Sequence, residues 1–336
     1  MMAADIGTVL KKKDKNNALH REIQAALTLM DGKLAAAAST AAAPMGGDLA
    51  ELCLSKGGKR FRPALAYICY RMGGSRGTDI LSLMCMIELM HTASLIHDDI
   101  VDGAAVRRGL PTINSVRGDS AAVQSGDFLL AKAMELLHIY RGTGINETLA
   151  DVSYQMCLGE FQQQALRFDL CAASKEIYFG MINRKTAMLI AASCYCGATA
   201  GGMCEDDAQR LYRYGKSLGI AFQMRDDLLD YMGKPTAGEA AGQDLRNGIF
   251  TLPVIEMVER GASEQICSLL QKCDKTEDEV TRLTEHIKRS GALGYAEAAI
   301  NEQTWQAAGE LDGFSPSPEG AALKDLAFLL SGVKTR

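Results

Sequence analysis

Apolar residues recur along most of this chain at the three- and four-residue spacing of amphipathic helices, with Ala, Leu, Met, Gln and Glu as frequent members of the pattern. This spacing brings apolar side chains to one face of an α-helix. The alternation of β-branched and aromatic residues that is typical of strands is nearly absent. We therefore expect an all-α fold, with roughly ten helices stacked around one core.

Clusters of Gly, Pro and other turn-forming residues divide this pattern into segments. They lie at residues 55–58, 72–77, 108–112, 141–144, 233–248 and 313–320. None of them has the composition of an interdomain linker, so we expect residues 21–336 to form a single all-α domain. Residues 1–20 are expected to be a flexible, charged N-terminus. We expect no signal-peptide core there, because the charged stretch 11–15 comes before any apolar stretch develops.

The bulk composition agrees with an ordinary soluble enzyme. The 336 residues are 47% hydrophobic and carry a net charge of −5, which gives no basic footprint for nucleic acid or for an anionic membrane surface. The longest apolar run, residues 188–202, is short for a membrane span and rich in Ala, Gly and Ser, so we expect a buried helix and no transmembrane segment. A cytoplasmic location is the default expectation, with an organelle matrix such as that of the mitochondrion as the alternative.

The cysteines give no sign of a disulfide framework or a zinc site. There are ten of them, without a CxxC pair. Five fall inside apolar helical runs, namely Cys69, Cys85, Cys157, Cys194 and Cys196. We expect these five thiols to be reduced and buried, as in an intracellular protein.

Two aspartate-rich motifs are the main chemical signal of the chain. They are DDIVD at residues 98–102 and DDLLD at residues 226–230, and each follows an apolar stretch with helical spacing. In a helix, the first and last aspartate of each motif lie four residues apart on one face, where like charges repel. Mg²⁺ prefers carboxylate oxygen and completes its shell with water and substrate phosphate. The sequence therefore predicts a site for Mg²⁺ and a diphosphate.

Cationic residues near the first motif supply a second kind of diphosphate partner. On the helix expected from about Ile80 to Asp102, His91 shares a stripe with Asp98 but lies roughly 10 Å from it, far enough to serve another phosphate group. Further cations occur upstream beside Gly57 and Gly58 and downstream before a turn, namely Lys59, Arg60, Arg62, Arg107 and Arg108. The chain thus offers two ways to bind a diphosphate. One uses carboxylates with a metal ion, and the other uses Lys, Arg and His side chains without metal.

Four segments stand in the order of the motifs of the trans-isoprenyl diphosphate synthases, and the chain resembles this family over about residues 57–253. They are GGKRFRP at residues 57–63, HTASLIHDDIVDGAAVRRG at 91–109, KTA at 185–187 and FQMRDDLLD at 222–230. One such motif is weak evidence, whereas four in order are strong. The chain is similar in particular to the long-chain polyprenyl branch, of solanesyl or decaprenyl type.

The resemblance implies a fold and an activity. The fold is the isoprenoid-synthase bundle of antiparallel helices around a deep central cavity, usually an obligate homodimer. The activity is head-to-tail addition of isopentenyl diphosphate to an allylic diphosphate primer, farnesyl or geranylgeranyl diphosphate, through an allylic carbocation. The implied product is a long prenyl chain for a quinone, as in ubiquinone biosynthesis.

By matching position, the resemblance also assigns roles to individual residues. Several Mg²⁺ ions on the allylic diphosphate would be held by Asp98, Asp102 and Asp226, with Asp227 or Asp230. Isopentenyl diphosphate would be bound by Lys59, Arg62, His91 and Arg108. The allylic side would be formed by Arg107, Lys185, Thr186 and Gln223, the last three of which would also stabilise the carbocation.

The loop after the second motif departs from the family pattern. Two expected Gly-Lys pairs are replaced by Gly238-Glu239 and Gly248-Ile249, so two cations are missing. Lys234 lies in the same loop, and its long stem would allow it to reach the allylic diphosphate instead.

Product length is predicted from the residues one turn before the first motif. Ala93 and Ser94 are both small, and we expect their side chains to line the path of the growing tail. In the family, bulky aromatic residues at these positions stop elongation early. The small side chains therefore favour a long product of solanesyl or decaprenyl class.

Four alternatives stay open at this point. Each aspartate motif alone would more often be a solvated helix face or cap. A terpene cyclase would share the fold, although its second metal motif usually mixes Asn, Ser and Glu. A noncatalytic or regulatory subunit of a heteromeric prenyl synthase would share the sequence pattern. A phosphohydrolase built on His97 and Asp98 would need further histidine ligands, and the chain has five histidines in all.

Overall fold

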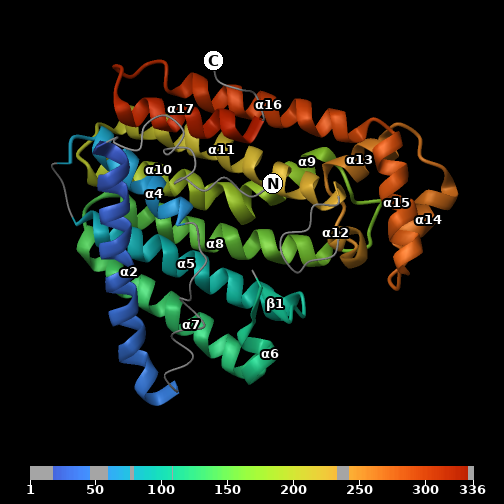
Figure 1. Cartoon of the computed structure of the whole chain (residues 1–336), viewed down its shortest axis with the longest axis horizontal. Helices are drawn as coiled ribbons and strands as arrows, with labels where there is room; N and C mark the ends of the chain where they lie inside the picture. The colour runs from blue at the N-terminus through green and yellow to red at the C-terminus, as the bar shows by residue number, and fades with distance from the viewer. Residues whose placement is uncertain (1–17, 46–59, 76–78, 108, 233–241, 332–336) are drawn as a thin grey trace.

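The computed structural model describes residues 18–36 with their side chains, 37–45 as backbone, and then 60–75, 79–107, 109–232 and 242–331. Nearly all of these residues are helical, so the all-α prediction is confirmed. The longer helices lie side by side along the long axis of the molecule (Figure 1). Helix α2 runs across one end, and α12 to α15 form the other end. Lys59, Arg108, Lys234 and the start of the chain lie outside the described residues, and the expectations for them stay predictions.

The chain passes through a series of helices that one short hairpin interrupts. In order, the elements are α2 Ala18–Met45, α4 Phe61–Met72, α5 Ile80–Val101, β1 Val106–Arg107, β2 Leu110–Pro111, α6 Ile113–Arg117, α7 Asp119–Leu136, the 3-10 helix η1 Leu137–Tyr140, α8 Gly144–Ala165, α9 Lys175–Ile182, the π-helix η2 Asn183–Ala187, α10 Met188–Ala200, α11 Glu205–Tyr231, α12 Gln243–Asn247, α13 Leu252–Glu259, α14 Glu264–Gln271, α15 Glu277–Arg289, α16 Ala292–Glu310 and α17 Pro318–Ser331.

Capping side chains fix several helix starts. The carboxylate of Asp79 accepts from the backbone N–H groups of Leu81 and Ser82, so α5 begins where the sequence pattern predicts it. Thr276 and Glu279 form a reciprocal capping box at the start of α15. The predicted breaks at 72–77, 141–144 and 313–320 lie at junctions between helices, whereas the break at 233–248 contains the short helix α12.

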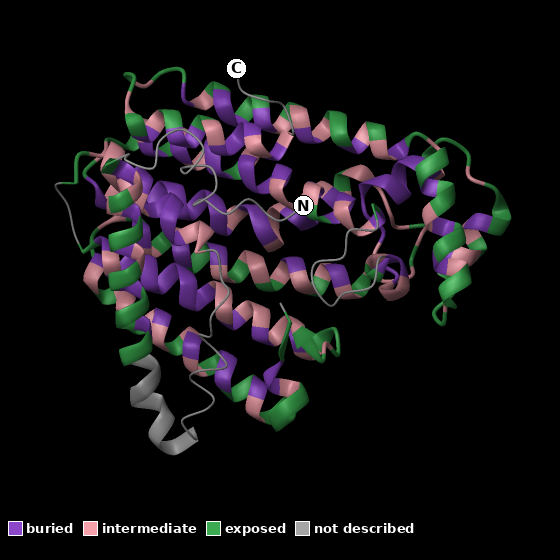
Figure 2. Cartoon of the chain, viewed as in Figure 1, coloured by how far each residue is buried: buried purple, intermediate pink, exposed green. Residues whose placement is uncertain are grey.

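The interior divides into two hydrophobic clusters, both buried in Figure 2. The larger cluster runs through the long helices, and the smaller one fills the end formed by α12 to α15. Glycines let α11 approach α10 and η2 closely: a β-carbon on Gly215 would lie 2.7 Å from the Cα of Ala191 on α10, and one on Gly219 would lie 2.6 Å from the Cα of Ala187 on η2. Both glycines thus serve close helix packing.

Burial corrects one expectation about the cysteines and supports another about the apolar runs. Cys69, Cys85, Cys194 and Cys196 are buried, but Cys157 is exposed on α8. The apolar run that begins at residue 188 forms α10, which is buried almost throughout. Among the described helices, only α5 is long and apolar enough to cross a membrane, and it is 72% buried by the rest of the protein, as a core helix is.

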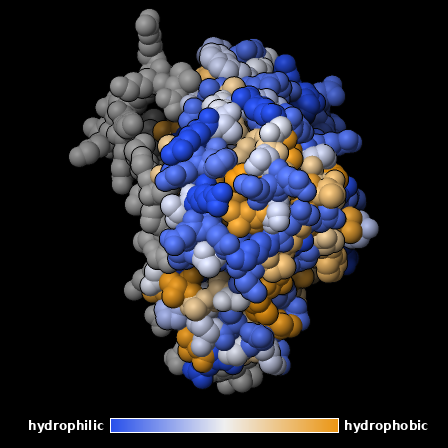
Figure 3. Space-filling model, turned by 90° about the vertical axis from the view of Figure 1, so that its right-hand side faces the viewer, coloured by the Kyte–Doolittle hydropathy of each residue, from blue (hydrophilic) through white to orange (hydrophobic). Residues whose placement is uncertain are grey.

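The end of the molecule that carries α12 to α15 faces the viewer in Figure 3. Its visible surface is largely hydrophilic, and hydrophobic side chains gather in smaller groups near the middle and the lower part of the view. A hairpin of two-residue strands, β1 paired with β2, follows α5 and departs from the helical pattern of the described chain. This hairpin carries Arg107, one of the predicted site residues.

Candidate active site

The first aspartate motif occupies the C-terminal end of α5. Asp98 is half-buried in the last turn, and Asp102 is the exposed C-cap residue, whose N–H donates to the Asp98 carbonyl. Burial raises the pKa of Asp98 from 3.8 to about 7; Lys185 opposes this rise, and Glu160 and Asp102 add to it. Because its surroundings disfavour the charged form, this carboxyl group is one that a bound cation would ionise.

Arg107 belongs to the same end of α5, because the hairpin brings it back onto the motif. Its Nε atom donates to Oδ1 of the buried Asp99 at 2.6 Å. The Asn114 side chain donates to the Asp99 carbonyl at 3.3 Å and to the Ala104 carbonyl at 3.1 Å, which ties the hairpin down. The structure thus places Arg107 beside the motif, with an ion-pair partner that the sequence analysis did not anticipate.

Lys185 is presented by a π-helical turn, η2, that interrupts the rod formed by α9 and α10. Such bulges occur often at functional sites. The turn packs on Gly159 of α8, where a β-carbon would lie 2.9 Å from the backbone nitrogen of Lys185 and 3.0 Å from the Cβ of Arg184. Because Gly159 has no side chain, the ammonium of Lys185 reaches Glu160 at 2.7 Å and Oε1 of Gln163 at 3.3 Å.

The same lysine connects the two aspartate motifs electrostatically. Burial acts against its charge, but the carboxylates of Asp98 and Glu160 outweigh burial and raise the Lys185 pKa above its ordinary value. Lys185 also lowers the pKa of Asp244, a carboxyl group at the start of α12 that burial, Asp227 and Asp230 together raise well above its ordinary value. Lys185 therefore lies within electrostatic reach of both clusters, as a shared site requires.

The three aspartates of the second motif have three different environments at the C-terminal end of α11. Asp226 is exposed. Asp227 is buried, and it accepts from the Tyr178 hydroxyl at 2.6 Å and from Nε2 of Gln223 at 2.7 Å. Burial raises the pKa of Asp227 to about 7 in spite of these two hydrogen bonds.

Asp230 acts as a cap for a neighbouring element. Its carboxylate accepts from the backbone N–H groups of Gly242, Gln243 and Asp244 at 3.0 to 3.2 Å, at the start of α12. Burial raises its pKa, and these backbone hydrogen bonds oppose the rise. Of the three aspartates, Asp226 is thus the one whose exposure suits a ligand of an incoming metal ion, and the metal role of Asp227 and Asp230 stays a prediction.

Thr186 and Gln223 meet between η2 and α11. The Thr186 hydroxyl donates to Oε1 of Gln223 at 2.7 Å, and the other end of the same amide donates to Asp227.

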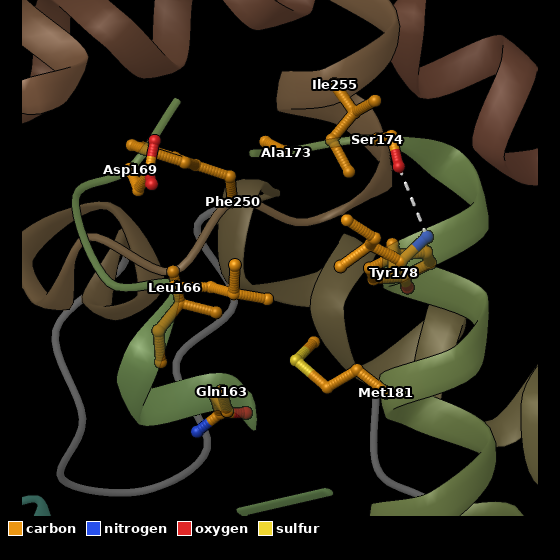
Figure 4. A pocket seen from close by; sticks show the side chains of 11 residues that line it. Gln163, Leu166, Asp169, Ala173, Ser174, Tyr178, Met181, Phe250 and Ile255 are labelled. Carbon is orange, nitrogen blue, oxygen red and sulfur yellow. Dashed lines mark hydrogen bonds between the residues drawn. The ribbon is translucent and has the colours of Figure 1, made fainter. Parts of the chain in front are cut away.

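Figure 4 shows the neighbouring pocket, with Tyr178 and Met181 of α9 facing Gln163 and Leu166 at the end of α8. The volume of this pocket is about 30 Å³. This volume suits one or two water molecules and is far too small for a prenyl chain.

Two of the predicted isopentenyl diphosphate ligands are in contact. Nη1 of Arg62 lies 3.1 Å from Nε2 of His91. A guanidinium can only donate, so Nε2 of His91 accepts and the ring carries its proton on Nδ1. Arg60, which the sequence analysis grouped with these cations, instead donates to Asp31 at 2.9 Å and to the buried Glu88 at 2.6 Å, and so joins α2, α4 and α5.

His97 packs outside this site. It faces α7, where its imidazole ring occupies the space that a β-carbon on Gly126 would need. The nearest carboxylate oxygen is that of Asp127 at 3.6 Å.

The metal-binding chemistry fits an ion shared with substrate. Within the described part of the chain, no group of three or more His, Cys, Asp and Glu side chains is close enough to hold a metal ion by itself. Mg²⁺ is ordinarily bound by one or two carboxylates together with phosphate oxygens and water. Asp98, Asp102 and Asp226 are carboxylates suited to this arrangement, and the raised pKa of Asp98 marks a place where positive charge is favoured.

Several residues that build the site escaped the sequence analysis. They are Gly159, Glu160, Gln163, Tyr178 and Asp244. Gly159 and Glu160 are adjacent within a helical stretch, and Asp244 lies in the Gly-rich break at residues 233–248. Their roles depend on contacts between helices, which no local pattern reveals.

Comparison with known proteins identifies the class. The model of the family described as polyprenyl synthetase matches residues 46–288, and the chain belongs to this family. Its relatives are prenyl diphosphate synthases, so the protein is a prenyltransferase of the trans-prenyl diphosphate synthase type. This class replaces the terpene-cyclase and phosphohydrolase interpretations.

Individual relatives and solved structures agree over almost the whole chain. The chain is 32% identical to heptaprenyl diphosphate synthase component 2 of Geobacillus stearothermophilus, over 94% of this chain and 98% of the relative. A decaprenyl diphosphate synthase from Rhodobacter capsulatus superposes with a TM-score of 0.86 at 32% identity, covering 94% of this chain and 98% of that one. A polyprenyl synthase from Caulobacter crescentus, solved with calcium and isoprenyl diphosphate, gives 0.86 at 31% identity, with 94% and 97% covered.

The predicted isoprenoid-synthase fold and the long-chain type of synthase are thereby supported. The names of the relatives do not agree on one product, because octaprenyl and geranylgeranyl diphosphate synthases are also among them.

Proposed function

We propose that this protein is a long-chain trans-polyprenyl diphosphate synthase that adds isopentenyl diphosphate to farnesyl or geranylgeranyl diphosphate with Mg²⁺. The observation that carries this proposal is the position of Lys185. It lies within electrostatic reach of Asp98 and Asp102 on α5 and of Asp244 beside the second motif. A diphosphate with its metal ions would therefore meet carboxylates from both motifs and a cation from a third element.

The residues divide the work between the two substrates. Bound Mg²⁺ would neutralise the charge that develops on the departing diphosphate. Lys185 would add positive charge at the same place, and the oxygens of Thr186 and Gln223 would present negative dipole ends toward the allylic cation. The Arg62–His91 pair would hold the diphosphate of isopentenyl diphosphate, so that its double bond is the nucleophile next to the cation. The cation formed by this attack would then lose a proton to the released diphosphate.

The proposed product is a chain of heptaprenyl to decaprenyl length for a quinone. Ser94, one turn before Asp98, is small and partly exposed, and its hydroxyl donates to the His91 carbonyl at 2.9 Å. Ala93 is 3% exposed and packs in the core. If one of the two positions borders the path of the tail, Ser94 is the better candidate.

The test is prenyl transfer by the purified chain alone. It is incubated with MgCl₂, isopentenyl diphosphate and either primer, and the products are analysed by mass spectrometry. Polyprenyl products that require both substrates and disappear with EDTA support the proposal. No product from the pure chain, with product only after addition of a second polypeptide, would instead make it one component of a heteromeric synthase.

We also propose that the functional unit is a homodimer formed through the outer face of α8. Tyr154 and Phe161 lie two turns apart on this helix and are 61% and 73% exposed. Large aromatic side chains on one exposed stripe are typical of protein interfaces. Light scattering should give a dimer for the wild type, and the double variant Tyr154→Glu, Phe161→Glu should be monomeric. A monomeric wild type would contradict the dimer but not the reaction.

A further inference from the structure

Four side chains form one continuous hydrogen-bonded chain across three helical elements beside the proposed reaction site. The Tyr178 hydroxyl on α9 donates to Oδ2 of Asp227 on α11. Oδ1 of Asp227 accepts from Nε2 of Gln223, one turn earlier on the same helix. Oε1 of Gln223 then accepts from the Thr186 hydroxyl on η2. The three distances are 2.6, 2.7 and 2.7 Å.

The direction of every bond in this chain follows from Asp227. In its ionised form Asp227 only accepts hydrogen bonds, so the amide group of Gln223 must turn its NH₂ end toward it. Its carbonyl oxygen is then forced toward Thr186, which in turn must donate its proton. Two oxygens, one from Gln223 and one from Thr186, are thereby held 2.7 Å apart. Each keeps at least one lone pair that the hydrogen bond between them does not use.

Tyr178 holds the far end of this arrangement. Its side chain is 2% exposed, and its ring packs edge-on against Phe179 at 5.5 Å between centroids, so it has little freedom to move. Asp227 is 7% exposed. A buried carboxylate that loses one strong donor can turn about its side-chain bonds, and the Gln223 amide would lose its fixed partner.

We propose that Tyr178 is a positioning residue for prenyl transfer: through Asp227 it fixes the amide of Gln223, so that the oxygens of Gln223 and Thr186 are pre-oriented toward the developing allylic cation. This inference rests on the function proposed above. Pre-oriented dipoles stabilise charge in the transition state without reorganisation. Tyr178 therefore acts on the rate of ionisation and not on the binding of metal or diphosphate.

The test compares Tyr178→Phe with Tyr214→Phe. Tyr214 is a matched control, because it is also fully buried and its hydroxyl donates to a backbone carbonyl, that of Leu323, at 2.7 Å. Both variants lose one buried hydrogen bond, but only Tyr178→Phe loses a bond of the series that leads through Asp227 to Gln223 and Thr186. Steady-state kinetics with farnesyl diphosphate, isopentenyl diphosphate and MgCl₂ are combined with the slow hydrolysis of farnesyl diphosphate alone, which reports ionisation.

We expect Tyr178→Phe to lower kcat and the hydrolysis of farnesyl diphosphate by about tenfold each, as loss of one hydrogen bond to a charged group predicts. Both KM values and the half-saturating Mg²⁺ concentration should change by less than about twofold, since binding interactions remain. Tyr214→Phe should lower the melting temperature while kcat stays at the wild-type value.

A double-mutant cycle with Gln223→Met checks the route of the effect. If Tyr178 acts through Gln223, Tyr178→Phe should have no further effect on kcat in the Gln223→Met background. Full activity of Tyr178→Phe, an additive loss in the cycle, or a raised Mg²⁺ requirement would overturn the inference. An inactive wild-type protein would overturn the proposed function itself, and the inference with it.

Discussion

At the scale of single residues, one short motif serves three purposes. Asp226 is exposed, Asp227 is buried under Tyr178, and Asp230 accepts three backbone N–H groups at the start of α12. Chemically identical side chains thus differ because α11 presents them to solvent, to α9 and to the following loop. Substitution at each position should accordingly change a different measurable property.

The clearest contrast is between Asp226→Ala and Asp230→Ala. We expect Asp226→Ala to lower kcat by about 100-fold or more, since even the outer partners of metal ligands are worth about 10- to 100-fold. Its stability should change by less than about 0.5 kcal/mol. Asp230→Ala should instead cost about 0.5–2 kcal/mol of stability, as lost helix caps do. Chemical denaturation and steady-state kinetics of both variants check this, and the reverse pattern would mean that Asp230 is the more important ligand.

The raised pKa of Asp98 predicts that the protein releases a proton when it binds metal and diphosphate. The pKa of Asp98 is raised from 3.8 to about 7, so the metal-free folded protein holds this proton more tightly than the unfolded chain does. Stability without metal should therefore fall as pH rises from 3.8 toward 7, the opposite of a salt-bridged carboxylate. Below about pH 7, binding of Mg²⁺ with diphosphate should release about one proton from Asp98.

Isothermal titration calorimetry in two buffers of different ionisation enthalpy measures this release. Asp98→Asn serves as the control, because its side chain has no proton to lose. Equal proton release by the wild type and by Asp98→Asn would assign the proton to another group.

At the scale of elements, the contact of η2 with α8 decides where Lys185 points. Gly159→Ala would place a methyl group 2.9 Å from a backbone nitrogen of η2, so the turn must move. We expect a loss of about 1–3 kcal/mol, as for other overpacked sites, together with a higher KM for the allylic primer. Gly180→Ala is the control: Gly180 lies inside α9 with nothing within 4 Å of the added carbon. That change should stabilise the protein by about 0.5–1 kcal/mol and leave KM unchanged.

The sequence predicted those parts of the site that depend on local spacing. The stripe of His91, Asp98 and Asp102 follows from the helical period, and α5 has the expected bounds. The ion pair of Arg107 with Asp99 depends on a hairpin that turns the chain back, and the pair of Lys185 with Glu160 depends on a bulge that the apolar period does not record. Asp230 finds its N–H partners only beyond a connecting segment. These contacts required the packed structure.

At the scale of the whole molecule, product length should depend on space beside α5. Ser94→Phe would place a ring at the partly exposed position one turn before Asp98, and we expect it to extend a farnesyl primer only to about geranylgeranyl length, with turnover retained. Ala93→Phe would instead force a ring into the close-packed core and should cost about 1–3 kcal/mol. Mass spectrometry of the products and thermal melts separate the two variants. A wild-type product from Ser94→Phe would place the tail elsewhere.

The π-helical turn also bears on how this gene tolerates mutation. Elements α9, η2 and α10 follow one another without a break from Lys175 to Ala200, and an α-helix advances each residue by about 100° around its axis. The bulge therefore acts as one inserted residue, which lets Lys185 face α8 while its neighbour Thr186 faces α11. Removal of a single codon between positions 183 and 187 would restore regular α-helical winding. Either Lys185 would then turn away from α8 or Thr186 would turn away from α11. An in-frame deletion there would change no aspartate, and it would still disconnect the two halves of the site.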